Sequence, residues 1–176
     1  RPHMNIHKAV ILAAGLGTRF LPVTKSIPKV MLPVLDTPLI HYAVGEAVAS
    51  GIEHVIFVIS DNQESIANYF QGSKDLEKVL ENRTDSRMLD RIESIPAPEH
   101  ISYVYQHKQN GIGDALLCAK DVIGDDPFAL IFPDDLIWSK FPTIGSMAKL
   151  FDTLKCSVVA VREVSDDMVP NLGIVG

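Results

Sequence analysis

Residues 8–33 read KAVILAAGLGTRFLPVTKSIPKVMLP, and this stretch decides the predicted fold. It opens with an uninterrupted apolar run, Ala9–Ala14, whose length suits a strand buried on both faces of a parallel sheet. The run stops at Gly15 and Gly17, where backbone N–H groups can approach a ligand without a Cβ atom in the way. The run ends in two alanines, whose small side chains leave room for a base or a ribose.

Three cations follow the glycines within one short loop that prolines interrupt: Arg19, Lys25 and Lys29. Backbone donors and cations at the end of a buried strand suit a polyphosphate better than a neutral ligand. The loop is not a Walker A motif, because no Gly-Lys-Ser/Thr follows the glycines. It is not a Rossmann fingerprint either, because Phe20 stands where a third glycine or alanine is needed and a proline follows at Pro22.

Short apolar runs predict further strands, and apolar residues at helical spacing predict helices between them. After the first run, strands are expected at 54–59, 101–106, 128–132 and 156–161. A first helix is expected from Thr37-Pro38, with Thr37 as its N-cap, to Gly51. Further helices are expected at 64–70, within 74–92, after the loop 111–114, and at 144–154. This alternation predicts an α/β fold in one domain, with a doubly wound, mostly parallel, Rossmann-like sheet in three αβα layers.

In such a sheet, ligands bind beyond the carboxyl ends of the strands. Gly15, Gln106 and Asp134 each lie at or just after a predicted strand end, so the sequence predicts a composite site there. Asp134 with Asp135 can bind a divalent cation such as Mg²⁺, and the alternative is a turn in which Asp caps the next segment. Gln106 carries an amide donor and acceptor suited to the edge of a uracil ring, and the alternative is a glutamine exposed at a strand end.

The composition favours a small anionic ligand over a nucleic acid or a membrane. A formal net charge of −6 and a pI near 5.4 argue against general nucleic-acid binding, so the cationic loop is a local feature. Cys118 and Cys156 form no disulfide framework and are interpreted as buried, reduced thiols in a cytoplasm. No apolar run reaches the ~18 residues of a transmembrane helix, and no signal peptide is visible.

The loop as a whole, GLGTRFLPVTKSIPKVMLPV at residues 15–34, resembles the signature loop of the sugar-phosphate nucleotidyltransferase family. The charged stretch 74–92 is similar to a segment of the uridylyltransferases in this family and fits the thymidylyltransferases poorly. The resemblance implies that UTP and glucose 1-phosphate give UDP-glucose and pyrophosphate by in-line attack on the α-phosphate. The alternatives are a transferase for dTTP or GTP and a sugar 1-phosphate, or a non-catalytic regulatory module that binds nucleotide on the same fold.

The resemblance also implies roles for single residues. Arg19 and Lys29 would be catalytic, because they would hold the nucleotide phosphates and offset charge in the transition state. Phe-Pro-Asp-Asp resembles the Leu-Pro-Asp motif of the family, which implies that Asp134 binds Mg²⁺. Gly173 resembles, weakly, a glycine that lies against the hexose. The residues expected to bind the nucleotide are Ala13, Ala14, Gly15, Gly17, Thr18, Gln106 and Gly111.

Lys25 and the stretch 74–92 keep two interpretations each, and Asp114 has one. Lys25 either contacts phosphate or is solvated. Asp114 has no clear counterpart in the family and is expected to cap the helix that follows it. The stretch 74–92 is expected to be a surface helix, with an oligomer contact as the alternative, and the protein is expected to form a homo-oligomer.

Both ends of the chain carry an expectation. Residues 1–3 precede Met4 and are expected to be the remnant of an expression tag, which leaves 4–176 as the nucleotidyltransferase domain. Members of the family are longer, and Asn171–Gly176 resembles the start of a strand. The C-terminal part of the family domain, with a second metal carboxylate and most sugar-binding residues, is therefore expected to be missing.

Overall fold

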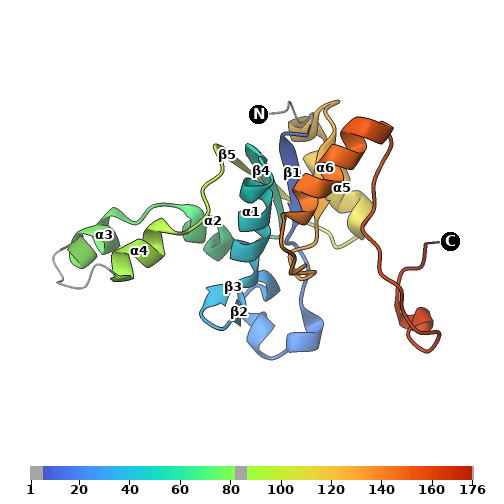
Figure 1. Cartoon of the computed structure of the whole chain (residues 1–176). Helices are drawn as coiled ribbons and strands as arrows, with labels where there is room; N and C mark the ends of the chain where they lie inside the picture. The colour runs from blue at the N-terminus through green and yellow to red at the C-terminus, as the bar shows by residue number, and fades with distance from the viewer. Residues whose placement is uncertain (1–5, 82–86, 176) are drawn as a thin grey trace.

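Parallel strands form the central sheet of the structure, a computed structural model that describes residues 6–81 and 87–175 (Figure 1). The strands of this sheet are β1 (Lys8–Leu12), β4 (His54–Ile59), β5 (His100–Tyr105) and β6 (Phe128–Ile131). Their order, β5-β4-β1-β6, places the first strand inside the sheet, so the chain winds outward from β1 in both directions. The predicted doubly wound, parallel sheet is confirmed, and each of these strands lies within two residues of its predicted position.

Helices cover both faces of the sheet, which gives the three predicted layers (Figure 1). Three helices pack on one face and one on the other: α1 (Leu39–Ala49), α2 (Glu64–Phe70) and α6 (Thr143–Leu154), against α5 (Ile112–Ile123). Neighbouring residues of β1 point to opposite faces, since Ile11 belongs to the cluster with α1 and Val10 to the cluster with α5. A strand buried on both faces needs apolar side chains throughout, which explains the uninterrupted run in the sequence.

The start of α1 differs from the prediction. Thr37-Pro38 forms β3, which pairs antiparallel with β2 (Pro33–Val34), and α1 begins one residue later at Leu39. Thr37 donates its hydroxyl hydrogen to the Asp36 carboxylate at 3.1 Å and does not cap the helix. The predicted N-cap at Thr37 is therefore wrong, because a two-residue hairpin uses its backbone.

The strand predicted at 156–161 is also wrong. These residues follow α6 in a segment without strand structure, and Figure 1 shows this segment leaving the body of the protein. Val159 and Val161 are exposed. A strand needs a neighbouring backbone to take its hydrogen bonds, and none of the strands in the described chain pairs with this segment.

The predicted helical stretch 74–92 forms two helices, α3 (Lys74–Glu81) and α4 (Arg87–Glu93). They reach out to one side of the sheet and its covering helices (Figure 1). Residues 82–86 between them, like the predicted tag remnant at 1–3, lie outside the described residues. The assignment of 4–176 to one nucleotidyltransferase domain stays a prediction.

Lys8 joins the amino edge of the sheet to the end of α5. Its Nζ donates hydrogen bonds to the carbonyl oxygens of Val122 at 3.3 Å and Ile123 at 2.8 Å. It also forms an ion pair with Asp126 at 2.6 Å. A cation at the C-terminus of a helix satisfies carbonyl groups that lack partners within the helix and complements the negative end of its dipole.

A partly buried histidine on β4 predicts a dependence of stability on pH. Burial lowers the pKa of His54 below its usual value, and the neighbouring charges of Lys8 and His100 act in the same direction. The unfolded chain therefore binds this proton more tightly, so stability falls as the pH drops below about 6.5 towards the folded-state pKa. Above about pH 6.5, His54 is neutral in the folded and the unfolded chain, so this loss of stability is absent.

We expect His54→Gln to reduce this loss, because glutamine does not titrate and can keep a hydrogen bond to the Ser102 hydroxyl, now 2.8 Å from His54 Nε2. The measurement is the urea midpoint of wild type and variant at about pH 7.5 and about pH 5.5. The same fall in midpoint for both proteins would contradict the assignment to His54.

Candidate active site

The loop after β1 folds back on itself through three single turns of 3₁₀ helix: η1 (Thr18–Phe20), η2 (Val23–Lys25) and η3 (Lys29–Met31). Gly17 precedes η1 with φ of 63°, in the left-handed region that favours glycine. Its carbonyl oxygen accepts a hydrogen bond from the Thr24 hydroxyl at 2.8 Å. A Cβ atom on Gly17 would lie 2.9 Å from Lys29 Cβ, so the glycine allows the end of the loop to pack against its beginning.

An ion pair joins this loop to the end of β6. Lys29 Nζ donates to the Asp134 carboxylate, and the same ammonium lies 5.7 Å from the centre of the Phe20 ring. The Lys29 side chain is 25% exposed and the Asp134 side chain 43% exposed, so ligands can reach both groups from solvent. Two of the predicted site residues, 105 positions apart in the chain, are therefore in direct contact.

Asp135 takes a different role from its neighbour. Its backbone N–H donates to the carbonyl oxygen of Phe132 at 3.0 Å, which closes the turn after β6, and the residue is exposed. A turn thus follows β6, and it presents the Asp134 carboxylate to Lys29.

Gln106 is held at the carboxyl end of β5. Its backbone N–H donates to Ile59 at 2.8 Å, which continues the β4–β5 ladder by one residue, and only 3% of the residue is exposed. Its side-chain Nε2 donates to the carbonyl oxygen of Gly111 at 3.1 Å and to the Asp114 carboxylate at 2.8 Å. Gly111 has φ of 99°, which lets the chain turn into α5.

Asp114 is the residue that sequence reasoning missed. It lies in the first turn of α5, and the N-cap position belongs to Gly111, so the expected capping role is wrong. The only signal in the sequence was a carboxylate eight positions after a glutamine, and this signal gains meaning only once the loop between them is folded.

The other predicted site residues lie below the loop, on the loop, or on the segment that follows α6. Ala13 and Ala14 are buried below the loop, and the Ala13 N–H donates to Val58 at 2.8 Å. Gly15, Thr18 and Arg19 are exposed on the loop. Gly173 lies on the segment that follows α6 and runs apart from the sheet, so the structure does not bring it to the others (Figure 1).

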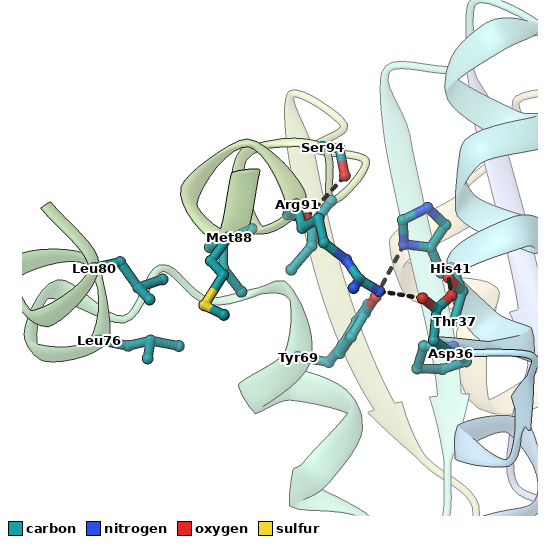
Figure 2. Close-up of a pocket in the computed structure, with 12 residues that line it drawn as sticks. Asp36, Thr37, His41, Tyr69, Leu76, Leu80, Met88, Arg91 and Ser94 are labelled. Atoms are coloured by element: carbon teal, nitrogen blue, oxygen red, sulfur yellow. Dashed lines mark hydrogen bonds and ion pairs between the residues drawn. The ribbon is translucent and has the colours of Figure 1, made fainter. Parts of the chain in front are cut away.

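A separate cavity of about 550 Å³ opens between α1 and the pair α3–α4 (Figure 2). At its polar end His41 Nδ1 lies 2.9 Å from the Tyr69 hydroxyl, and Arg91 forms an ion pair with Asp36. Burial lowers the pKa of His41 and raises the pKa of Tyr69, so it favours the neutral form of both groups. Apolar side chains such as Met88 line the other end, and none of the predicted site residues borders this cavity.

Asp134 is the metal ligand expected from the sequence. In the described part of the chain, no group of three or more His, Cys, Asp or Glu side chains could hold a metal ion by itself. This arrangement suits Mg²⁺, which commonly takes one or two carboxylates and completes its shell with substrate phosphates and water. One accessible carboxylate beside the loop expected to bind phosphate is a suitable donor for such an ion.

None of the helices in residues 6–81 and 87–175 has the length and apolar character needed to cross a membrane.

A doubly wound sheet with a glycine- and lysine-bearing loop at the carboxyl end of its first strand defines an α/β protein of the nucleotide-binding class. The family model described as "Nucleotidyl transferase" matches residues 8–175. The chain belongs to this nucleotidyl transferase family, which confirms the resemblance seen in the signature loop.

Several uridylyltransferases resemble the chain. It is 41% identical over 172 residues to UTP–glucose-1-phosphate uridylyltransferase 1 of Staphylococcus saprophyticus, an alignment that covers 98% of this chain and 60% of that protein. A UTP-bound UGPase from Acinetobacter baumannii is 41% identical with a TM-score of 0.79, covering 85% of this chain and 54% of that one. A UDP-glucose pyrophosphorylase complexed with UDP-glucose is 40% identical with a TM-score of 0.80, covering 93% and 60%. The chain thus spans about 60% of the length of the curated relatives that it matches.

Proposed function

We propose that this protein carries out the reaction of UTP with glucose 1-phosphate to give UDP-glucose and pyrophosphate. The observation that carries the proposal is the Lys29–Asp134 ion pair, which joins the loop proposed to bind phosphate to the carboxylate proposed to bind a metal ion. The names of the relatives support the choice of UTP and glucose 1-phosphate.

In the proposed reaction, a phosphate oxygen of glucose 1-phosphate attacks the α-phosphorus of UTP in line with the bond to the leaving group. The new phosphorus–oxygen bond forms as the bond to the bridging oxygen breaks, and pyrophosphate leaves with that electron pair. Both the attacking and the leaving atoms are phosphate oxygens, so the protein needs no proton carrier. Its contribution is positioning and stabilisation of charge.

Lys29 and Arg19 would supply the positive charge. The Lys29 ammonium already faces an anionic oxygen of Asp134, and a triphosphate would offer it further oxygens of the same kind. The exposed guanidinium of Arg19 belongs to the same loop and can bind phosphate oxygens in pairs. Together these cations would offset the negative charge that develops between the attacking and leaving oxygens.

Asp134 would hold Mg²⁺ through its carboxylate, with phosphate oxygens and water as the other ligands. When bound, the ion supplies a positive charge that polarises phosphoryl oxygens. Gln106 and the backbone of Gly111 would hold the uridine, while Ala13 and Ala14 leave space beside the loop.

A homo-oligomer and a cytoplasmic location are part of the proposal. Leu76, Val79 and Met88 are exposed apolar side chains on α3 and α4, and they offer a surface on which a second copy can pack. Cys118 and Cys156 are both free thiols, which suits a reducing compartment, but Cys118 is only partly buried and Cys156 is exposed, so the predicted burial is wrong. Measuring the molar mass in solution tests whether the protein forms a homo-oligomer.

The test of the function is pyrophosphate release by this chain with Mg²⁺ and glucose 1-phosphate, with UTP, dTTP, GTP and ATP compared side by side. We expect release with UTP, and loss of release when Mg²⁺ is chelated. Thermal unfolding with each nucleotide runs in parallel, because a ligand that binds the folded state raises the unfolding temperature whether or not turnover follows.

Release with dTTP or GTP in place of UTP would overturn the choice of nucleotide and keep the reaction class. Stabilisation by nucleotide without release would favour the non-catalytic binding module. The absence of both release and stabilisation with every nucleotide would contradict the proposal as a whole.

A further inference from the structure

The contact between Asp114 and Gln106 determines which atom of the Gln106 amide can meet a ligand. The amide nitrogen of glutamine carries two hydrogens and its carbonyl oxygen accepts. In this structure Nε2 faces two acceptors, the carbonyl oxygen of Gly111 at 3.1 Å and the carboxylate of Asp114 at 2.8 Å. Both hydrogens are therefore committed to the protein, and only the carbonyl oxygen Oε1 remains to meet a ligand.

The Gln106 residue is 3% exposed, so a small part of it reaches solvent. Within residues 6–81 and 87–175, every buried side-chain nitrogen or oxygen has a hydrogen-bond partner. The contacts of the Gln106 side chain are made through Nε2 alone, so Oε1 must be the accessible atom. Gln106 thus presents an acceptor, and no donor, at the carboxyl end of β5.

An accessible acceptor suits some bases and not others. The ring nitrogen N3 of uracil carries a hydrogen and donates, whereas the N3 of cytosine has a lone pair and accepts. An amide oxygen facing N3 therefore forms a hydrogen bond with uracil and meets a repulsive lone pair in cytosine. A site that leaves a buried polar group unpaired against the wrong ligand discriminates more strongly than one that merely lacks a contact.

We propose that Asp114 is a positioning residue that fixes the orientation of the Gln106 amide and so makes the site prefer UTP over CTP. This inference rests on the proposed function, because it assigns the nucleotide base to Gln106. A flipped amide would place Oε1 against the carboxylate of Asp114 and the carbonyl oxygen of Gly111, two acceptors that repel it. The bond to the carboxylate is charge-assisted and is the stronger of the two.

Without the carboxylate, a flipped amide loses only the bond to Gly111. The amide could then turn its NH₂ group towards the base and donate to N3 of cytosine. The loss of Asp114 should therefore change the choice between two pyrimidines, in addition to any loss of affinity.

The experiment measures dissociation constants of UTP and CTP for the 176-residue chain and three variants by calorimetry. Asp114→Ala removes the acceptor, while Asp114→Asn keeps the shape and one acceptor oxygen. Asp121→Ala is the matched control, because Asp121 is an exposed carboxylate on the same helix. Thermal unfolding of each variant verifies that the protein is folded.

We expect wild type to prefer UTP, and Asp114→Ala to lower the CTP-to-UTP ratio of dissociation constants by about tenfold, the effect of one charge-assisted hydrogen bond. Asp114→Asn should retain part of the preference, and Asp121→Ala all of it. If the role of Asp114 is purely structural, Asp114→Ala will weaken the binding of UTP and CTP equally. The ratio of their dissociation constants would then stay unchanged, which would overturn the inference.

Equal affinity of the wild-type chain for UTP and CTP would overturn the inference and leave the reaction class intact. If the chain binds no nucleotide, both the proposed function and this inference are contradicted. The ratio in the variants therefore separates a failure of the amide argument from a failure of the nucleotide site.

Discussion

Lys29→Ala is expected to lower pyrophosphate release with UTP by about a thousandfold, in the range seen when a preorganised charge-stabilising group is removed from an active site. The physical reason is that Lys29 is the cation packed against Gly17 and held beside Asp134, where the triphosphate is proposed to bind. UTP binding should weaken less than turnover, about tenfold to a hundredfold, because part of the interaction is made only as charge develops in the transition state. The measurement is pyrophosphate release with increasing UTP, together with UTP binding by calorimetry.

Lys25→Ala is the matched control. Lys25 is an exposed cation of the same loop, in η2, and lies outside the proposed machinery. Its replacement removes the same charge from the loop at a different place. Equal losses in the two variants would mean that only the total charge of the loop matters, and release at the wild-type rate by Lys29→Ala would remove the assigned role altogether.

Gly17→Ala is expected to have the second large effect, on both stability and binding. The new Cβ would lie 2.9 Å from Lys29 Cβ and 3.0 Å from Thr24 Cγ2, and the residue would keep a left-handed φ of 63°. The backbone strain alone costs about 1–2 kcal/mol, and the displaced Lys29 would no longer meet the phosphates. We expect a lower thermal unfolding temperature and UTP affinity reduced by at least about tenfold, as one lost charged contact implies.

Gly15→Ala separates these two consequences. Apart from Gly15 and its two chain neighbours, no atom of the described residues lies within 4 Å of a Cβ built on Gly15, so the fold has room for the methyl group. If the open space is where a nucleotide approaches the backbone, the variant should unfold like wild type and still bind UTP more weakly. A loss of stability in Gly15→Ala equal to that of Gly17→Ala would contradict the proposed difference between the two glycines.

The central sheet could be predicted from sequence because burial on both faces leaves a local signature. Val10 and Ile11 point to opposite faces and are both fully buried, so a continuous apolar run suffices to mark β1. The segment 156–161 has apolar character too, but a strand requires a partner, and pairing is a property of the whole fold. The helix start predicted at Thr37-Pro38 was wrong for a related reason, since the same two residues suit a helix start and a short hairpin.

The candidate site was predictable as a set of residues and not as a set of contacts. Lys29 and Asp134 were nominated separately, and their ion pair depends on the turns η1–η3 that bring the loop back over the strand ends. Asp114 was interpreted as a cap because it lies early in a helix. Its bond to Gln106 follows from the turn at Gly111, whose positive φ only the folded backbone reveals.

The two ends of α5 make contacts with different roles. At one end, Lys8 ties the last carbonyl groups of the helix and Asp126 to the amino edge of the sheet. At the other end, Asp114 orients a side chain proposed to read the base. Substitutions at the reading end can therefore change ligand preference while the anchored end keeps the helix in place. Such a separation favours evolvability: new nucleotide preferences can be selected on this helix without first compensating for a weakened scaffold.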